Sequence, residues 1–172
     1  MDTTDGGWLV IQRRRDFTVD FNRSWTEYKN GFGNISGDYW LGLDAIGKLM
    51  NHSYSRLRVD LVADPGRKYW AEYGEFFFSA IFYGDSPIRG YGLHVSGYSG
   101  DAGNGLTPSY QRDFITYDRN LNGCFSSRKG AWWYPYDCST TTNLFTPDKN
   151  DMTWGDIGRV TFSEMKIKSE WY

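Results

Sequence analysis

The stretch DRNLNGCFSSRKGAWWYPYDCS, residues 118–139, decides how the remaining sequence is interpreted. It contains both cysteines of the chain, Cys124 and Cys138, and a run of aromatic residues between them. A disulfide joining the two would close a loop of about 15 residues and, on the chain-entropy model, would stabilise the fold by about 3 kcal/mol. Two buried free thiols are the alternative if the protein is cytosolic. We expect a stapled loop that presents side chains to a ligand, on a scaffold formed by the rest of the chain.

Composition limits the class of protein. A length of 172 residues is typical of one domain, so we expect residues 1–172 to form a single domain. The net charge of −2 and the pI near 5.7 argue against a nucleic-acid partner. No segment approaches the ~18 consecutive apolar residues of a membrane span. The basic run Arg13–Arg15 is expected to be a solvated strand end rather than a phosphate-binding patch.

Periodicity predicts several strands and two short helices. Ser24 and Glu27 have the spacing of a capping box, so a helix should begin there and end near Gly31, and Asp44 should cap a second helix. Residues 57–61 alternate strictly between apolar and charged, which indicates a half-buried strand that turns at residues 64–66. The glycine-rich residues 97–105 should be irregular, and the other strands are expected at residues 8–12, 69–73, 76–82, 91–95 and 160–167. Residues 17–21 should form a further short strand or an extended segment.

This order of elements predicts an α+β fold. It should consist of a twisted antiparallel sheet with short helices and a long irregular, disulfide-stapled binding region toward the C-terminus. Neither histidine, His52 or His94, has metal-ligand spacing with another histidine or a cysteine. No nucleophile–base pair or phosphate-binding loop is recognisable either, so we expect the protein not to be an enzyme.

Asp118, Asn120, Asn122 and Gly123 repeat the first half of an EF-hand calcium loop, with alternating oxygen side chains before a glycine. The position of the bidentate glutamate is taken by Lys129, so any Ca²⁺ bound here should be weak. An Asn-Gly turn capped by Asp118 is the alternative interpretation.

Three Asn-x-Ser sequons indicate a secreted, extracellular protein whose surface could carry glycans. Their asparagines are Asn22, Asn34 and Asn51.

Matching motifs run along the sequence from near one end to the other. The sequence resembles the fibrinogen C-terminal domain, as found in ficolins and tachylectins, at GGWLVIQRR (6–14), DFNRSW (20–25), YKNGFG (28–33), WLGL (40–43), LRVDL (57–61), GYSGDAG (97–103), GAWWY (130–134) and EMKIK (164–168). The resemblance implies an extracellular recognition module, often in immune lectins that bind acetylated sugars and commonly assembled into homo-oligomers. The family's N-terminal segment would precede the GGW strand, so we expect the sequence to be an excerpt.

The resemblance also implies a small acetyl-binding pocket beside the second cysteine, Cys138, with an aromatic cup for the methyl group. This sequence departs from that pattern at Ser139, where lectin members usually have histidine, and at Arg128, where tyrosine is common. The residues expected to contact a ligand are Arg128, Trp132, Trp133, Tyr134, Tyr136, Asp137, Cys138 and Ser139.

Three further points concern these residues. For Trp132 and Trp133, pure core packing is the alternative. Arg128 and Lys129 could hold anionic groups of a glycan, in place of binding assisted by calcium. Lectin members often have a cis peptide before the second cysteine, so the Asp137–Cys138 bond could also be cis.

These observations lead to a main and an alternative prediction of function. The main prediction is a secreted innate-immune lectin that recognises microbial surface glycans through the stapled loop. The alternative is a protein-interaction module of the angiopoietin or fibrinogen type, which binds a receptor or peptide.

Overall fold

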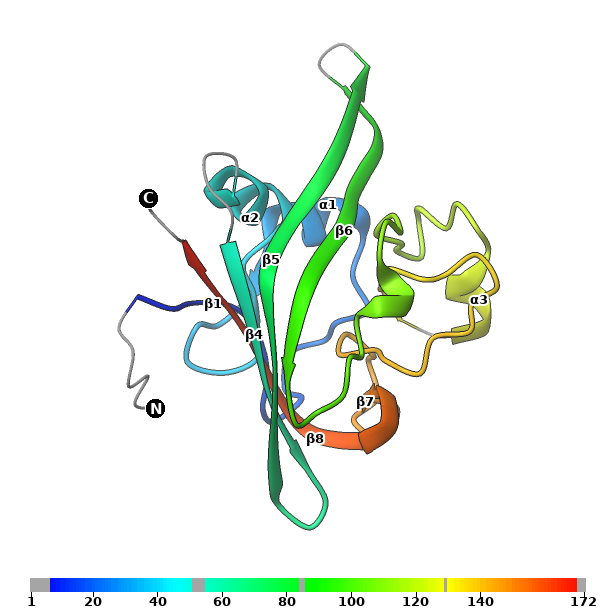
Figure 1. Cartoon of the computed structure of the whole chain (residues 1–172). Coiled ribbons are helices and arrows are strands. Elements are labelled where there is room, and N and C mark those ends of the chain that lie inside the picture. Colours follow the sequence, from blue (N-terminus) through cyan, green and yellow to red (C-terminus); the bar gives the residue numbers. More distant parts are fainter. Residues whose placement is uncertain (1–6, 51–54, 84–85, 129, 170–172) are drawn as a thin grey trace.

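The computed structural model describes residues 7–50, 55–83, 86–128 and 130–169, and of residues 80–83, 86–89, 127 and 128 it describes the backbone alone. Within these ranges, eight strands form one antiparallel sheet in the order β2-β3-β1-β8-β4-β5-β6, and β7 pairs with β8 (Figure 1). The α+β prediction is confirmed. The strands are β1 (Leu9–Arg14), β2 (Phe32–Gly33), β3 (Tyr39–Trp40), β4 (Ser55–Ala63), β5 (Arg67–Tyr83), β6 (Ser86–Gly100), β7 (Thr153–Trp154) and β8 (Gly158–Ser169).

The alternating residues of β4 behave as expected, with every second side chain buried. The strands predicted at residues 69–73 and 76–82 are one continuous strand, β5, because its pairing with β6 keeps one register from Ala71 to Ser79. Strand β6 continues to Gly100, so the first part of the glycine-rich segment is regular. Gly100 permits this pairing because a Cβ atom there would lie 2.3 Å from the carbonyl oxygen of Trp70.

The described helices are short: α1 (Trp25–Asn30), α2 (Leu43–Met50), α3 (Cys124–Arg128) and the 3₁₀ turns η1 (Thr107–Ser109) and η2 (Gly155–Ile157). The capping box is confirmed, because the Ser24 hydroxyl accepts from the Glu27 amide and the Glu27 carboxylate accepts from the Ser24 amide. Asp44 lies in the first turn of α2 and does not cap it. None of these helices has the length and apolar character that a bilayer crossing requires.

The structure differs from part of each expectation for residues 13–21. Residues 17–21 form no strand. Arg14 is completely buried, with its guanidinium 4.2 Å from the ring centroid of Phe17 and 3.9 Å from that of Phe21. Arg13 is mostly buried as well, and its Nε donates to Glu164 across 2.8 Å. The apolar rings of Phe17 and Phe21 therefore make Arg14 part of the interior, whereas Arg15 is exposed as expected.

Strand β1 supports the C-terminal region through its polar side chains. The Nε2 group of Gln12 donates to the carbonyl of Leu144 across 3.4 Å, and Arg14 Nη1 donates to the carbonyl of Thr146 across 2.7 Å. Burial lowers the pKa of Arg14 to about 10, so its guanidinium stays charged at neutral pH. A loop 132 residues further along the sequence is thus fixed to the middle of the sheet.

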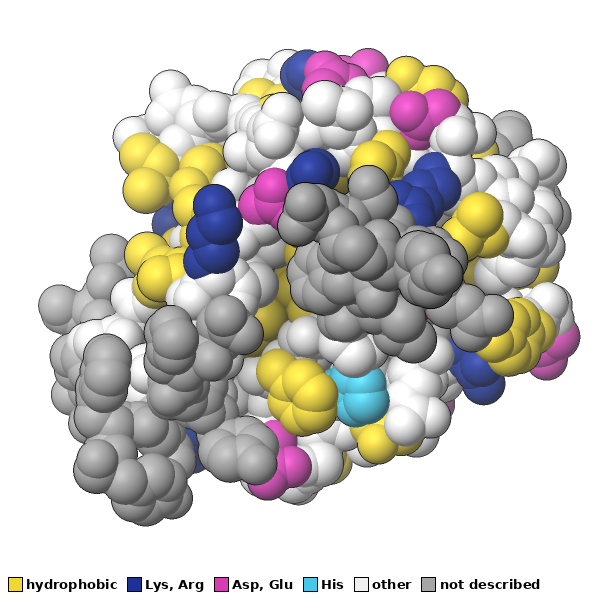
Figure 2. Space-filling model, turned by 90° about the horizontal axis from the view of Figure 1, so that it is seen from above, with side chains coloured by type: hydrophobic (Ala, Val, Ile, Leu, Met, Phe, Trp, Pro, Cys, Tyr) yellow, Lys and Arg dark blue, Asp and Glu magenta, His cyan; other side chains and the backbone are white. Residues whose placement is uncertain are grey.

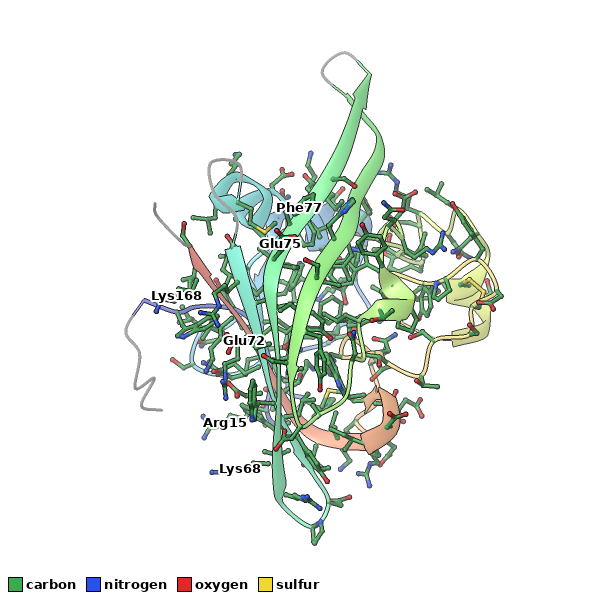
Figure 3. The ribbon with its side chains drawn as sticks, viewed as in Figure 1. Arg15, Lys68, Glu72, Glu75, Phe77 and Lys168 are labelled. Carbon is green, nitrogen blue, oxygen red and sulfur yellow. A yellow bond between two sulfur atoms is a disulfide. The ribbon has the colours of Figure 1, made fainter. Side chains whose placement is uncertain are left out.

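One face of the sheet is covered and the other carries charges. Strand β5 contacts α2, and Figure 1 shows the irregular region from about residue 100 to residue 157 beside the strands. The uncovered face carries ion pairs across neighbouring strands, such as Lys166 with Asp60 at 2.6 Å. Figure 3 labels Glu72, Glu75 and Phe77 along β5 on this face. Seen from above in Figure 2, the molecule shows basic, acidic and apolar side chains intermixed.

Candidate functional site

The two cysteines form the expected disulfide. Cys124, the first residue of α3, is bonded to Cys138 with an S–S distance of 1.98 Å and a sequence separation of 14. Cys124 is buried, whereas Cys138 is partly accessible. The prediction of a stapled loop is therefore confirmed, and both thiols are consumed in it.

The tryptophans inside the stapled loop do not face a ligand. Trp132 and Trp133 are completely buried. The indole nitrogen of Trp132 donates to the Ser109 hydroxyl across 3.1 Å, and that of Trp133 donates to the Tyr91 carbonyl across 2.8 Å. Because both side chains are buried, they pack in the core, as the alternative prediction had it, and do not make the expected ligand contacts. Their hydrogen-bonded indoles stabilise the base of the loop from inside.

The oxygens expected to bind calcium already accept hydrogen bonds. Asp118 Oδ1 accepts from the amide of Trp25, Asn120 Oδ1 from the amide of Phe125, and Asn122 Oδ1 from the amide of Cys124. These bonds cap the starts of α1 and α3. The described residues contain no cluster of three or more His, Cys, Asp or Glu that could hold a metal. Calcium binding stays a prediction: the Oδ1 atoms of Asn120 and Asn122 each have a further lone pair, and Oδ2 of Asp118 accepts no hydrogen bond from a described residue.

The polar end of the stapled loop lies at the surface. Tyr136 is 72% exposed, and Asp137 and Ser139 are accessible beside it. Asp137 Oδ1 accepts from the Ser139 amide across 3.1 Å, and hydrogen bonds from Ser139 hold the pKa of the Asp137 carboxyl below its ordinary value. The Asp137–Cys138 peptide is trans, contrary to expectation, and Cys138 adopts a φ of 58°. The Arg128 side chain and Lys129 lie outside the described residues.

A pocket of about 580 Å³ opens in the segment that follows Cys138. Its floor is Tyr134, one of the expected site residues, whose hydroxyl donates to the Gly130 carbonyl across 2.6 Å and accepts from Asn143 Nδ2 across 3.0 Å. The walls meet where Asn143 pairs with Thr153 through backbone hydrogen bonds. The lining residues are Tyr134, Thr140, Thr141, Thr142, Asn143, Thr146, Asn150, Asp151, Thr153, Gly155 and Gly158.

The interior and the rim of this pocket differ in their hydrogen bonding. Inside, the Thr140 hydroxyl accepts from the Thr142 amide, and the Thr142 hydroxyl accepts from the Gly155 amide. At the rim, the side chains of Thr141, Asn150, Asp151 and Thr153 make no hydrogen bond to any described residue. Among the lining residues that the structure describes, Asp151 alone is charged. The rim can therefore receive a cation or a group rich in hydrogen-bond donors.

Sequence reasoning missed this pocket and one nearby arginine. The available signal was the run Thr140–Thr142 directly after Ser139, a set of short polar residues where lectin members close an aromatic cup. The missed arginine is Arg112, which lies over the ring of Tyr136 with 4.3 Å between Cζ and the ring centroid. No periodic pattern joins residues 112 and 136, so only the folded protein brings them together.

Comparisons with known proteins agree with the fold. Residues 1–168 match the family model of the C-terminal globular domain of the fibrinogen beta and gamma chains. Angiopoietin-related protein 7 of Bos taurus is 40% identical over 149 residues, which is 84% of this sequence and 41% of that protein. The sequence thus spans less than half the length of that relative.

Two solved structures are similar over nearly the whole sequence. The fibrinogen-like globe domain of human ANGPTL6 has a TM-score of 0.82 and 30% identity, covering 96% of this protein and 79% of that one. The lamprey fibrin D-dimer, complexed with the peptide Gly-His-Arg-Pro-amide, has a TM-score of 0.78 and 25% identity, covering 98% of this protein and 63% of that one. The motifs, the sheet and these matches together place the protein in the family of fibrinogen C-terminal globular domains.

Proposed function

We propose that this domain is a non-catalytic protein-interaction module that binds a short segment of a partner in the pocket behind Cys138. The observation that carries the proposal is the pocket itself, with a hydrogen-bonded interior and, at its rim, the Asp151 carboxylate, which pairs with no described residue. A volume of about 580 Å³ is within the usual range for ligand pockets. The comparisons favour this alternative over the lectin function that the sequence predicted first, because the matched relatives include angiopoietin-related proteins.

The charge of the rim indicates which part of a partner would enter. An ammonium or guanidinium group would pair with Asp151, while the Thr141 hydroxyl and the Asn150 amide could bond to the backbone of the same segment. The peptide seen with the lamprey relative has such groups, an amino terminus and an arginine. We therefore infer that the partner presents a cationic segment. Tyr134 would shape the pocket from below and would not contact the cationic group itself.

A lectin function is the second candidate, and the adjacent Asn150 and Asp151 favour it. A carboxylate next to an amide accepts and donates hydrogen bonds in the pattern that sugar hydroxyls require. Microbial glycans and acetylated sugars are the expected ligands in that case. The pocket differs from an acetyl-binding cup because hydroxyl and amide groups dominate its lining.

We place the protein outside the cell, in agreement with its disulfide and its sequons. Asn22 and Asn34 are exposed and could carry glycans, whereas Asn51 lies outside the described residues. Assembly of the parent protein into homo-oligomers is part of the same proposal.

The experiment is calorimetric titration of the domain with Gly-His-Arg-Pro-amide, with its N-acetylated form and with N-acetylglucosamine. We expect the free peptide to bind, the N-acetylated form to bind more weakly, and Asp151→Asn to weaken binding about tenfold or more through loss of a charge-assisted hydrogen bond. Asp156→Asn is the matched control, since Asp156 is exposed but does not line the pocket.

The outcomes separate the candidates. Binding of the sugar alone, lost in Asp151→Asn, would replace the interaction module with the lectin. Equal effects of Asp151→Asn and Asp156→Asn, or no binding of any of the three probes, would contradict a ligand site in this pocket.

A further inference from the structure

Arg112 precedes the stapled loop in the sequence and is half-buried against it, and its guanidinium hydrogen-bonds to no described residue. Its Nε–H is buried without an acceptor among those residues. Its backbone is fixed, because the amide donates to the Ser109 carbonyl across 3.1 Å and the carbonyl accepts from the Leu93 amide across 3.2 Å. Only the two terminal nitrogens of the guanidinium can therefore reach a partner, and the fixed backbone holds them in place.

The ring of Tyr136 orients this guanidinium. The distance from Arg112 Cζ to the ring centroid is 4.3 Å, within the range of a cation–π contact. Tyr136 is 72% exposed, so the contact lies at the surface. Stacking on a ring restricts the guanidinium, and its two terminal nitrogens, which unlike Nε are not buried, stay available for bidentate binding of a carboxylate.

The neighbouring carboxylate does not neutralise Arg112 directly. Asp137 attracts the guanidinium electrostatically, but its Oδ1 is bonded to the Ser139 amide at 3.1 Å and the two side chains form no ion pair in the described structure. One cation and one nearby carboxylate leave little net charge. The surroundings therefore disfavour a dianion such as a phosphate monoester and suit a single carboxylate.

We propose that Arg112 and Tyr136 form a second recognition point, which binds the carboxylate of an acidic side chain on a protein partner. The inference rests on the proposed interaction function and deepens it: the partner would present a cationic group to Asp151 and a carboxylate to Arg112. Arginine and tyrosine are among the residue types that most often dominate protein interfaces, which favours a protein over a glycan as the source of the carboxylate.

The test is an NMR titration of the ¹⁵N-labelled domain with N-acetylglutamic acid α-amide, which carries one carboxylate. N-acetylglutamine α-amide is the neutral matched probe. We expect saturable shifts of the Arg112 Nε–H and of the Asp137 amide with the acid and no such shifts with its neutral counterpart. Arg112→Lys should keep the fold and bind roughly tenfold more weakly, because lysine lacks the planar fork. In Arg112→Gln the Asp137 shift should be lost, and Tyr136→Phe should retain it.

Three outcomes would overturn the inference: no saturable shift with the acid, an unchanged Asp137 shift in Arg112→Gln, or a response to N-acetylneuraminic acid or inorganic sulfate in place of the peptide acid. Failure of the pocket proposal would look different. In that case the cationic peptide would not bind, while the carboxylate titration would still report on Arg112.

Discussion

The hydroxyl of Tyr134 joins the floor of the pocket to the stapled loop, and Tyr134→Phe removes it without changing the ring. Two buried groups then lose their partner, the Gly130 carbonyl at 2.6 Å and the Asn143 amide nitrogen at 3.0 Å. An unsatisfied buried polar group costs about 1–3 kcal/mol. Asn143 lines the pocket, so water entering there can replace part of its loss, whereas the Gly130 carbonyl is enclosed. We expect the free energy of unfolding to fall by about 2–3 kcal/mol.

Urea denaturation followed by tryptophan fluorescence measures this change. With a slope of about 2 kcal/mol per molar urea, the midpoint should fall by roughly 1–1.5 M and the slope should stay constant. Tyr136→Phe is the matched control, because it deletes the same atom from an exposed ring and should alter stability by less than about 0.5 kcal/mol. If the two variants have the same midpoint, the Tyr134 hydroxyl is not the buried junction described above.

Three further predictions concern the disulfide, pH and calcium. Replacing Cys124 and Cys138 together by serine should lower the free energy of unfolding by about 3 kcal/mol, measured by the same denaturation, and an unchanged value would mean that the buried tryptophans alone fix the loop. Burial lowers the pKa of His94, so the unfolded protein takes up a proton before the folded one as the pH falls. The contribution of neutral His94 to the free energy of unfolding should therefore be fully present above about pH 6.5 and be lost as the pH falls below it. In thermal melts across this pH range, His94→Gln should flatten the decline of the melting temperature. A chelator should leave the melting midpoint unchanged, since the predicted oxygen ligands cap helices, and a clear drop would establish a resident calcium ion.

Sequence patterns predicted those elements whose formation depends on residues close together in the sequence or on the two cysteines. The alternation in residues 57–61 predicted β4, the Ser24–Glu27 capping box predicted the start of α1, and the spacing of the two cysteines in a secreted-type sequence suggested their bond. Each of these signals depends on neighbours within a few residues or on a single covalent pair. Family motifs then supplied the global arrangement, which no local pattern contains.

Predictions failed where a residue's surroundings come from other segments of the fold. Arg14 looked like a solvated strand end because no periodic pattern shows that Phe17 and Phe21 fold over it. The tryptophans looked like a pocket wall because aromatic residues serve cores and binding sites equally well in a sequence. The pocket behind Cys138 is lined by threonines and asparagines whose chemistry is common in ordinary loops, so only its concave shape identifies it.

Strand β1 lies between β3 and β8, and its side chains anchor the carbonyls of Leu144 and Thr146 from 132 residues away. Such distant contacts form late in folding, because the entropy cost of closing a long loop comes before the stabilisation that the contacts provide. On the ribosome, the binding surface therefore cannot mature until β8 has emerged to complete the middle of the sheet. Ligand capture by newly made protein would then report that synthesis of the sheet is finished.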